Sequence, residues 1–130
     1  MPFYTHVLPL PSASTASIGI LAKEFPRTNF VIGHMGFGPL DVEAIELASV
    51  LDNVFLETSA SNFLALDIAV RKAGASKLVF GSEFPLSDPM VEIAKVGRLR
   101  ISQSERDQIY SGNIIDLIQL PRHGGIYVHS

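Results

Sequence analysis

The sequence contains no cysteine and no tryptophan, and only 18% of its 130 residues are charged. Without cysteine there is no disulfide and no thiolate ligand, so any metal ion has to be held by nitrogen and oxygen atoms. No apolar run approaches the roughly 20 residues that span a bilayer, so we expect no membrane partner. The ten basic and 13 acidic residues give a net charge of −3 without a basic patch, which argues against a nucleic-acid partner.

Apolar side chains, by contrast, make up 47% of the residues. This content excludes a disordered chain and is enough for the core of one domain. We expect that domain to cover residues 1–118, and residues 119–130, with Pro121 and Gly124-Gly125, to form a loosely ordered tail. Because the sequence has no cysteine and does not start with a charged segment followed by an apolar one, the expected location is cytoplasmic.

Four short apolar runs recur along the chain, beginning at Phe3, Phe30, Val54 and Leu78. Their starts lie 27, 24 and 24 residues apart, which leaves room for one crossover helix between successive runs. Nearly every position in the runs is apolar, as is typical of strands buried on both faces of a parallel sheet. The spacing therefore predicts an α/β fold of four βα units with parallel strands.

Helices are expected over residues 12–25, 40–51, 62–73, 88–97 and 102–117, each with recognisable end signals. Pro26 stops the first, Gly74 ends the third, Asp88-Pro89 starts the fourth, and Ser102 to Glu105 matches a capping box. Glycines 33, 36, 38 and 81 are expected to serve tight turns between strands and helices. The apolar stripes predicted to be buried are Ile18, Leu21, Ala22 and Phe25; Val42, Ile45 and Ala48; and Val91, Ala94 and Val96.

Polar residues follow the apolar runs at the points where the strands should end. These residues are His6, His34, Glu57 and Glu83. Because binding and catalytic groups of parallel sheets gather at the carboxyl ends of the strands, this repeated placement predicts a site there.

Several motifs follow one another in a fixed order: Val-Ile-Gly-His-Met-Gly at 31–36, Asn-Val-Phe-Leu-Glu-Thr-Ser at 53–59, Leu-Val-Phe-Gly-Ser-Glu-Phe-Pro at 78–85, and Gly112-Asn113 within 109–117. The series resembles the carboxyl-terminal half of the amidohydrolase-related metal-dependent hydrolases (amidohydrolase family 2). That family has a TIM-barrel-like fold and includes lactonases, amide hydrolases and some decarboxylases. The resemblance extends from about Pro2 to Leu117. It implies that residues 1–118 are the carboxyl-terminal half of a TIM (β/α)8 barrel.

The resemblance also implies roles for individual residues. His6 stands in the position of the fifth-strand metal ligand, and His34 in that of the sixth-strand histidine that faces the substrate. Glu83 occupies the position of an aspartate that binds the metal, and its carboxylate is expected to take a proton from the attacking water. Glu57 and Thr58 are expected to line the substrate pocket, although Glu57 could instead cap the next helix. The implied cofactor is a divalent ion, with zinc the first candidate, and the implied partner is a small-molecule substrate.

The chain departs from the family pattern in two ways. It has no His-x-His pair, because it begins at what would be the fifth strand, so two expected ligands and the first half of the barrel are missing. Glutamate also places its carboxylate roughly 1.5 Å farther from the backbone than aspartate would at position 83. An isolated half-barrel would expose apolar inner-face residues, such as Val31 or Ile32 and Val79 or Phe80. We therefore expect the chain to need a second half-barrel or to self-associate.

The function predicted from these observations is metal-dependent hydrolysis of a small carboxylic-acid lactone, ester or amide, with this chain a fragment of a longer enzyme. Three alternatives remain: a related metal-dependent decarboxylase, a non-catalytic binding module, and a structural half-barrel that acts only when paired. His6, His34 and Glu83 favour an enzyme, whereas the missing His-x-His pair favours the last two for the isolated chain.

Overall fold

The computed structural model describes residues 1–119, which contain one sheet of four parallel strands. The strands are β1 (Phe3–Thr5), β2 (Phe30–Ile32), β3 (Val54–Glu57) and β4 (Leu78–Val79), and they are hydrogen-bonded in the order of the sequence. Each strand begins at the residue where an apolar run was predicted to begin, and each is parallel to its neighbour. This confirms the predicted fold of four βα units.

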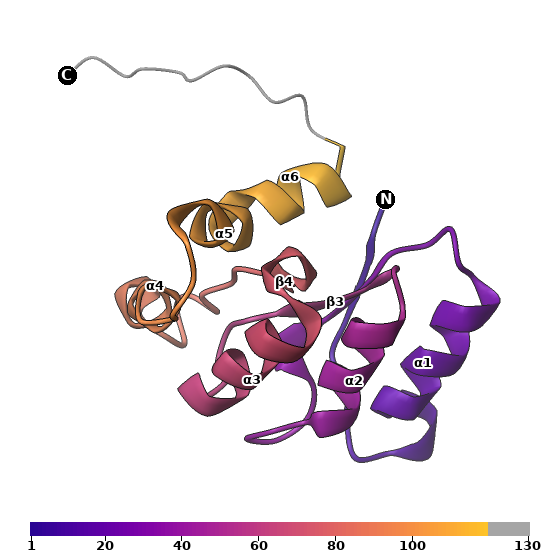
Figure 1. Ribbon diagram of the computed structural model, residues 1–130. Coiled ribbons are helices and arrows are strands. Elements are labelled where there is room, and N and C mark those ends of the chain that lie inside the picture. The colour runs from indigo at the N-terminus through magenta and orange to yellow at the C-terminus, as the bar shows by residue number, and fades with distance from the viewer. Residues whose placement is uncertain (120–130) are drawn as a thin grey trace.

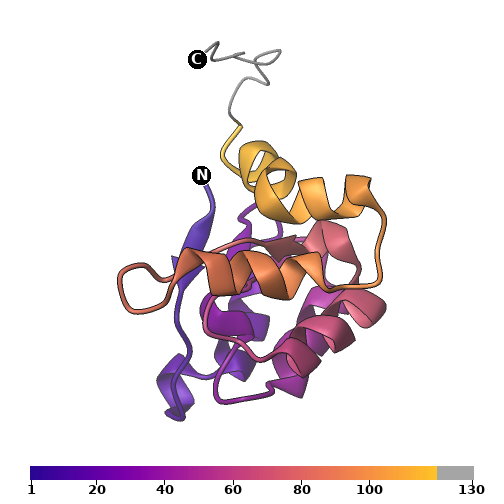
Figure 2. The ribbon, with the colours of Figure 1, turned by 90° about the vertical axis from the view of Figure 1, so that its left-hand side faces the viewer.

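The helices lie on both sides of the sheet. Figure 1 shows α1, α2 and α3 together on one side of the strands and α6 on the other, and Figure 2 shows α4 crossing in front of the sheet. No helix among residues 1–119 is long and apolar enough to cross a membrane. The α-helices are α1 (Thr15–Glu24), α2 (Val42–Val50), α3 (Phe63–Ala73), α4 (Pro89–Gly97), α5 (Gln103–Asp107) and α6 (Asn113–Leu117), with short 3-10 segments η1 (Pro11–Ala13), η2 (Gly33–Met35) and η3 (Ala75–Lys77) and a π-helical segment η4 (Gln108–Gly112).

The predicted helix signals lie where these helices begin and end. The Asp88 side chain accepts the Met90 N–H at the start of α4, and Gly74 ends α3 with a φ of 90°. Ser102 and Glu105 form both hydrogen bonds of the predicted capping box. Helix α1 starts three residues later than predicted, at Thr15, because the preceding residues form a 3-10 turn that begins at a proline.

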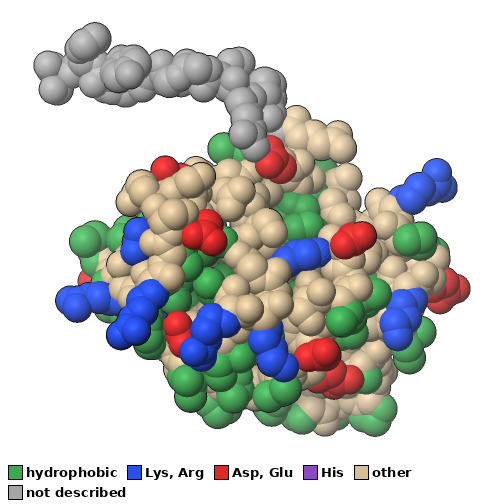
Figure 3. All heavy atoms as spheres, in the orientation of Figure 1, with side chains coloured by type: hydrophobic (Ala, Val, Ile, Leu, Met, Phe, Trp, Pro, Cys, Tyr) green, Lys and Arg blue, Asp and Glu red, His purple; other side chains and the backbone are tan. Residues whose placement is uncertain are grey.

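The main core lies between the sheet and helices α1 to α3. Ile32, Leu56 and Leu78 point from the strands toward this layer, where they meet Ile45 and Leu66. Burial of each such side chain contributes about 1.5–3 kcal/mol. The outer surfaces of these helices are seen in Figure 3, where single apolar side chains are scattered among acidic and basic ones.

Some residues that were predicted to be buried on the apolar stripes are exposed. Leu21 and Phe25 on α1 are exposed, because α1 packs against α2 on one flank only within the described chain, so its buried face is narrow. On α4, Val91 and Ala94 are exposed and Glu92 is buried. The spacing of apolar residues predicted the wrong buried face for α4, because this helix turns the carboxylate of Glu92, paired with Lys95, toward the protein. Val42 on α2 is exposed, whereas Ile18, Ala22, Ile45, Ala48 and Val96 are buried as predicted.

The inner face of the sheet is also more covered than the sequence indicated. Val31 and Val79, which were expected to be exposed, are buried under Leu117 of α6, with Phe55 and Ile114 packed around them. Helix α6 folds over this face because the apolar strand residues there need a cover. The edge strand β1 keeps apolar exposure, since Phe3 is 50% exposed.

Two buried asparagines secure the end of the sheet where the strands begin. Asn53 Nδ2 donates to the carbonyls of Ala22, Phe25 and Thr28, at 2.9, 3.2 and 2.9 Å. Asn113 Nδ2 donates to the carbonyls of Ala75 and Leu78, at 2.8 and 2.7 Å. These bonds tie helix and loop carbonyls to one end of the sheet and leave the polar residues at the other end to form a site.

Candidate active site

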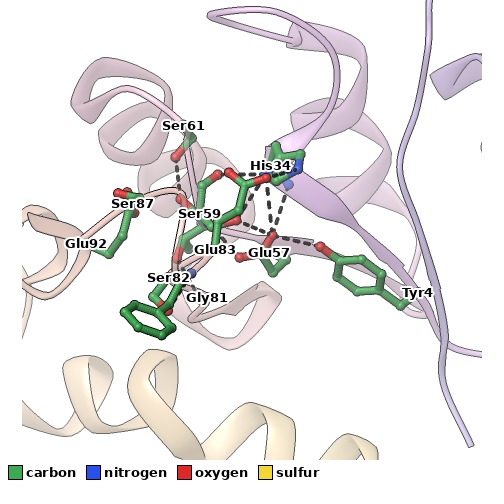
Figure 4. A network of polar contacts seen from close by, with 12 residues as sticks. Tyr4, His34, Glu57, Ser59, Ser61, Gly81, Ser82, Glu83, Ser87 and Glu92 are labelled. Atoms are coloured by element: carbon green, nitrogen blue, oxygen red, sulfur yellow. Dashed lines mark hydrogen bonds and ion pairs between the residues drawn. The ribbon is translucent and has the colours of Figure 1, made fainter. Parts of the chain in front are cut away.

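Polar side chains from all four βα units meet at the carboxyl ends of the strands (Figure 4). His6 directly follows β1, His34 lies in η2 after β2, Glu57 is the last residue of β3, and Glu83 lies in the loop after β4. His34 Nε2 lies 3.4 Å from Glu83 Oε1, and the rings of His6 and His34 stack with centroids 4.6 Å apart. The structure therefore brings His6, His34 and Glu83 together, as the order of the motifs implied.

Glu57 is the most buried ionisable group of this cluster, at 6% exposure. Its Oε2 accepts hydrogen bonds from Tyr4 Oη at 3.1 Å, from the His34 N–H at 3.1 Å and from Ser59 Oγ at 2.9 Å. Its Oε1 accepts the Ser59 N–H at 2.7 Å. Four donors from three segments thus satisfy the carboxylate. The helix-cap alternative for Glu57 was wrong, because the N-cap of α3 is Asn62.

Two glycines make room for this arrangement. A Cβ on Gly81 would lie 1.7 Å from Glu57 Oε1, and a Cβ on Gly33 would lie 2.6 Å from Tyr4 Oη and 2.7 Å from the His6 ring. Neither glycine has the positive φ of the tight turns expected for them, whereas Gly36 and Gly38 do. Gly33 and Gly81 therefore serve close packing at the inner face of the sheet.

The backbone is unusual at the two residues that face each other across the site. His34 has a φ of 56° and Glu83 a φ of 53°, values that side-chain-bearing residues adopt uncommonly. Such conformations cost of the order of 1–3 kcal/mol each and concentrate at functional sites. The hydrogen bond from the His34 N–H to Glu57 holds one of them in place.

The His34 ring is fixed on one side and partly open on the other. Its Nδ1 lies 3.0 Å from Ser59 Oγ and 3.2 Å from the Ser59 carbonyl oxygen. The opposite nitrogen, Nε2, faces Glu83, and both side chains are about one-third exposed. The open side of the ring can reach a bound molecule.

Thr58 has a different place from the one predicted. It is buried, and its hydroxyl accepts the Gly81 N–H at 3.4 Å, so it supports the segment that follows β4. Tyr4, which was not predicted as a site residue, points into the cluster because it lies two residues before His6, on the same face of the strand. Burial, and then the negative charge of Glu57, raise the pKa of the Tyr4 phenol well above its ordinary value, so this hydroxyl stays a donor at neutral pH.

Comparison with known proteins assigns the family. The sequence profile of the family described as Amidohydrolase matches residues 3–120, nearly the whole chain. The chain belongs to the amidohydrolase family. Among curated proteins, none matches it significantly.

Solved structures with the same fold include an amidohydrolase, a decarboxylase and a TIM-barrel protein. An amidohydrolase from Burkholderia multivorans with bound zinc superposes with a TM-score of 0.72 at 20% identity, over 91% of this chain and 53% of that one. A dihydroxybenzoic acid decarboxylase from Polaromonas, with bound manganese and the inhibitor 2-nitroresorcinol, gives 0.68 at 20% identity, over 98% and 52%. A TIM-barrel protein from Bordetella bronchiseptica gives 0.76 at 18% identity, over 92% and 46%. The chain thus spans about half the length of the structures it matches, and its sheet is half of a TIM barrel.

The donor atoms fit a divalent ion in kind but not in number. Imidazole nitrogen and carboxylate oxygen are donors that a divalent ion takes, and His6, His34 and Glu83 supply both kinds at one end of the sheet. Within residues 1–119, however, no three His, Asp or Glu side chains are grouped closely enough to hold a metal. A complete centre would need ligands from outside the described residues.

Proposed function

We propose that this chain supplies the carboxyl-terminal half of the active site of a metal-dependent amidohydrolase-family enzyme that acts on a small carboxylic-acid lactone, ester or amide. The observation that carries the proposal is the convergence of His6, His34 and Glu83 at the carboxyl ends of β1, β2 and β4. Two structures that share the fold contain zinc or manganese, which supports a divalent ion as cofactor.

In this proposal the residues divide the work by position. His6 and Glu83 would hold the ion, which when bound lowers the pKa of its water and polarises a carbonyl. His34 Nε2 and the Glu83 carboxylate lie 3.4 Å apart, so a proton taken from the nucleophile by one of them can be passed to the other. The Tyr4 hydroxyl, which stays protonated and donates its one hydrogen to Glu57, can accept a hydrogen bond from a substrate group next to these residues.

A second candidate is a metal-dependent decarboxylase, which would direct the same groups at a substrate carboxylate. It is favoured by the Polaromonas structure, which is a decarboxylase of dihydroxybenzoic acid. A non-catalytic binding or structural half-barrel is the third candidate, and it follows from the small number of ligands in the described chain.

Metal binding by the chain itself is the first test. Calorimetry with Zn²⁺ and Mn²⁺ should show weak binding to the parent chain and weaker binding to His6→Ala. Glu46→Gln, which changes an exposed carboxylate of α2 paired with Lys72, is the control and should bind as the parent does. Equal affinity of His6→Ala and the parent would remove His6 from the ligand set.

Turnover is the second test and separates the candidates. The chain is joined to an amino-terminal half-barrel that carries a His-x-His pair, and is assayed with carboxylic lactones and esters and with a dihydroxybenzoate. Glu83→Gln should reduce turnover more than metal content, because an amide oxygen can still coordinate but cannot take a proton. Glu83→Asp should raise activity if the additional methylene misplaces the carboxylate. Release of CO₂ without ester hydrolysis would select the decarboxylase, and equal activity of Glu83→Gln and the parent at saturating metal would favour the binding module.

A further inference from the structure

We propose that Glu57 and Ser59 are positioning residues that hold the His34 ring in its Nδ1–H form, so that the lone pair of Nε2 faces Glu83 and the open side of the site. The inference rests on the proposed function only for the use to which that lone pair is put. The relay itself is a chain of hydrogen bonds that runs from Glu57 through Ser59 to His34 (Figure 4).

The relay starts at the carboxylate. Two backbone N–H groups and two hydroxyls donate to the oxygens of Glu57, which as a carboxylate only accepts hydrogen bonds. The hydroxyl hydrogen of Ser59 is consequently committed to Glu57 Oε2, at 2.9 Å.

The second step fixes the proton on the ring. Because its hydrogen is used, Ser59 Oγ can only accept from His34 Nδ1, 3.0 Å away. The Ser59 carbonyl oxygen, 3.2 Å from the same nitrogen, is an acceptor by nature. Both neighbours of Nδ1 thus require a hydrogen on it, and in a neutral imidazole this leaves Nε2 as the basic nitrogen.

The consequence lies on the opposite side of the ring. Nε2 carries the lone pair and lies 3.4 Å from Glu83 Oε1, so a proton that enters between the two atoms meets an acceptor on each side. The other tautomer would donate from Nε2 to Glu83 and would make His34 unable to accept a proton there. Glu57 and Ser59 therefore prepare His34 to act as a base.

The tautomer can be measured without metal, substrate or a second half-barrel. Long-range ¹H–¹⁵N spectra of the full chain, recorded with a chelator at a pH where free imidazole is neutral, distinguish a protonated ring nitrogen from an unprotonated one. The His34 signals are assigned by their loss in His34→Gln. We expect the parent chain to show Nδ1 protonated and Nε2 unprotonated.

Matched variants test whether the relay is the cause. Ser59→Ala should convert the single tautomer into a mixture, and Ser59→Thr, which keeps a hydroxyl, should restore it. Glu57→Met, which removes the acceptor, should also give a mixture; if it does not fold, the Ser59 pair decides. Ser61→Ala is the control, because the Ser61 hydroxyl lies in the same loop but donates to the Thr58 carbonyl.

Two results would overturn the proposal. One is an Nε2–H tautomer in the parent chain. The other is an unchanged Nδ1–H tautomer in Ser59→Ala, which would mean that the Ser59 carbonyl alone sets the ring. Neither result depends on turnover, so a correct tautomer in a completed but inactive barrel would count against the proposed function and not against the relay.

Discussion

At the scale of single residues, position along the strands could be predicted from the sequence, whereas contacts between strands could not. His6, His34 and Glu83 were found because each follows an apolar run, and strand ends of a parallel sheet converge. Tyr4 and Ser59 take part through hydrogen bonds to Glu57, and such bonds depend on register and side-chain direction, which no single run encodes. The structure therefore adds Tyr4 and Ser59 to the site residues that the sequence already indicated.

Gly81 shows how closely the chain is packed around Glu57. A Cβ at this position would overlap Glu57 Oε1, so Gly81→Ala should destabilise the chain by about 1–3 kcal/mol, as overpacking of a core does. Gly97→Ala at the end of α4 is the control: its Cβ would be 3.7 Å from the nearest neighbour, and the change should be neutral or slightly stabilising. Urea denaturation of both variants gives the comparison. Equal stability of the two would mean that Glu57 moves aside without loss.

At the scale of the elements, end signals predicted the helices well, and periodicity predicted their buried faces less well. Helix α4 is the clearest failure, because it turns Glu92 toward the protein. Lys95 Nζ lies 2.6 Å from Glu92 Oε2 and donates to the Ser61 carbonyl at 2.5 Å. A pattern that counts apolar residues cannot anticipate a carboxylate that is buried because a lysine neutralises it. This pair joins α4 to the loop that carries Ser59.

Removing one partner of this pair should lower the free energy of unfolding. Lys95→Met leaves the Glu92 carboxylate buried without its counter-ion, and breaking a buried pair in this way costs about 3–5 kcal/mol. Glu92→Met combined with Lys95→Met should recover most of the loss, because no unpaired charge remains. Lys72→Met removes the exposed partner of Glu46 and should change the free energy of unfolding by less than about 1 kcal/mol. Similar losses in Lys72→Met and Lys95→Met, measured by denaturation, would show that the buried pair has no special weight.

The capping box of α5 should make stability depend on pH at the acid end. Hydrogen bonds from the Ser102 N–H and hydroxyl lower the pKa of Glu105 below its ordinary 4.5. Between the lowered value and 4.5 the unfolded chain binds more protons than the folded one, so this contribution is present above pH 4.5 and is lost as the pH falls through the folded-state pKa. The difference in unfolding free energy between the parent and Glu105→Gln should therefore shrink on acidification. Ser102→Ala removes the hydroxyl but keeps the backbone N–H, so in that background the pH dependence should become smaller; an unchanged pH dependence would mean that the backbone N–H alone sets it.

At the scale of the whole molecule, the order of motifs was enough to predict half of a TIM barrel, but not how this half covers itself. The inner face was expected to stay open, yet α6 lies over Val31 and Val79. The sequence predicted only one helix over residues 102–117. In the structure a π-helical segment and the packing of Ile109 in the core precede α6, and they set which face of the sheet α6 covers. Within the described chain β1 and β4 each pair with a neighbour on one side only, and β1 is the more exposed of these two edge strands.

This edge should control how the chain associates. Phe3 and Tyr4 are each about half exposed on β1, and an exposed apolar edge strand is a template for pairing with another chain. We expect sedimentation of the purified chain to show association that grows with concentration, and Phe3→Lys to shift it toward the monomer, because a charge on an edge strand opposes pairing. Ile20→Lys, at a 66% exposed position on the outer face of α1, is the matched control and should leave association unchanged.

The same Phe3→Lys change should weaken capture of an added amino-terminal half-barrel, since that half has to pair with β1 to close the barrel. A parent chain that stays monomeric at all concentrations, or an equal effect of both lysine variants, would contradict the assignment of the β1 edge as the surface of assembly.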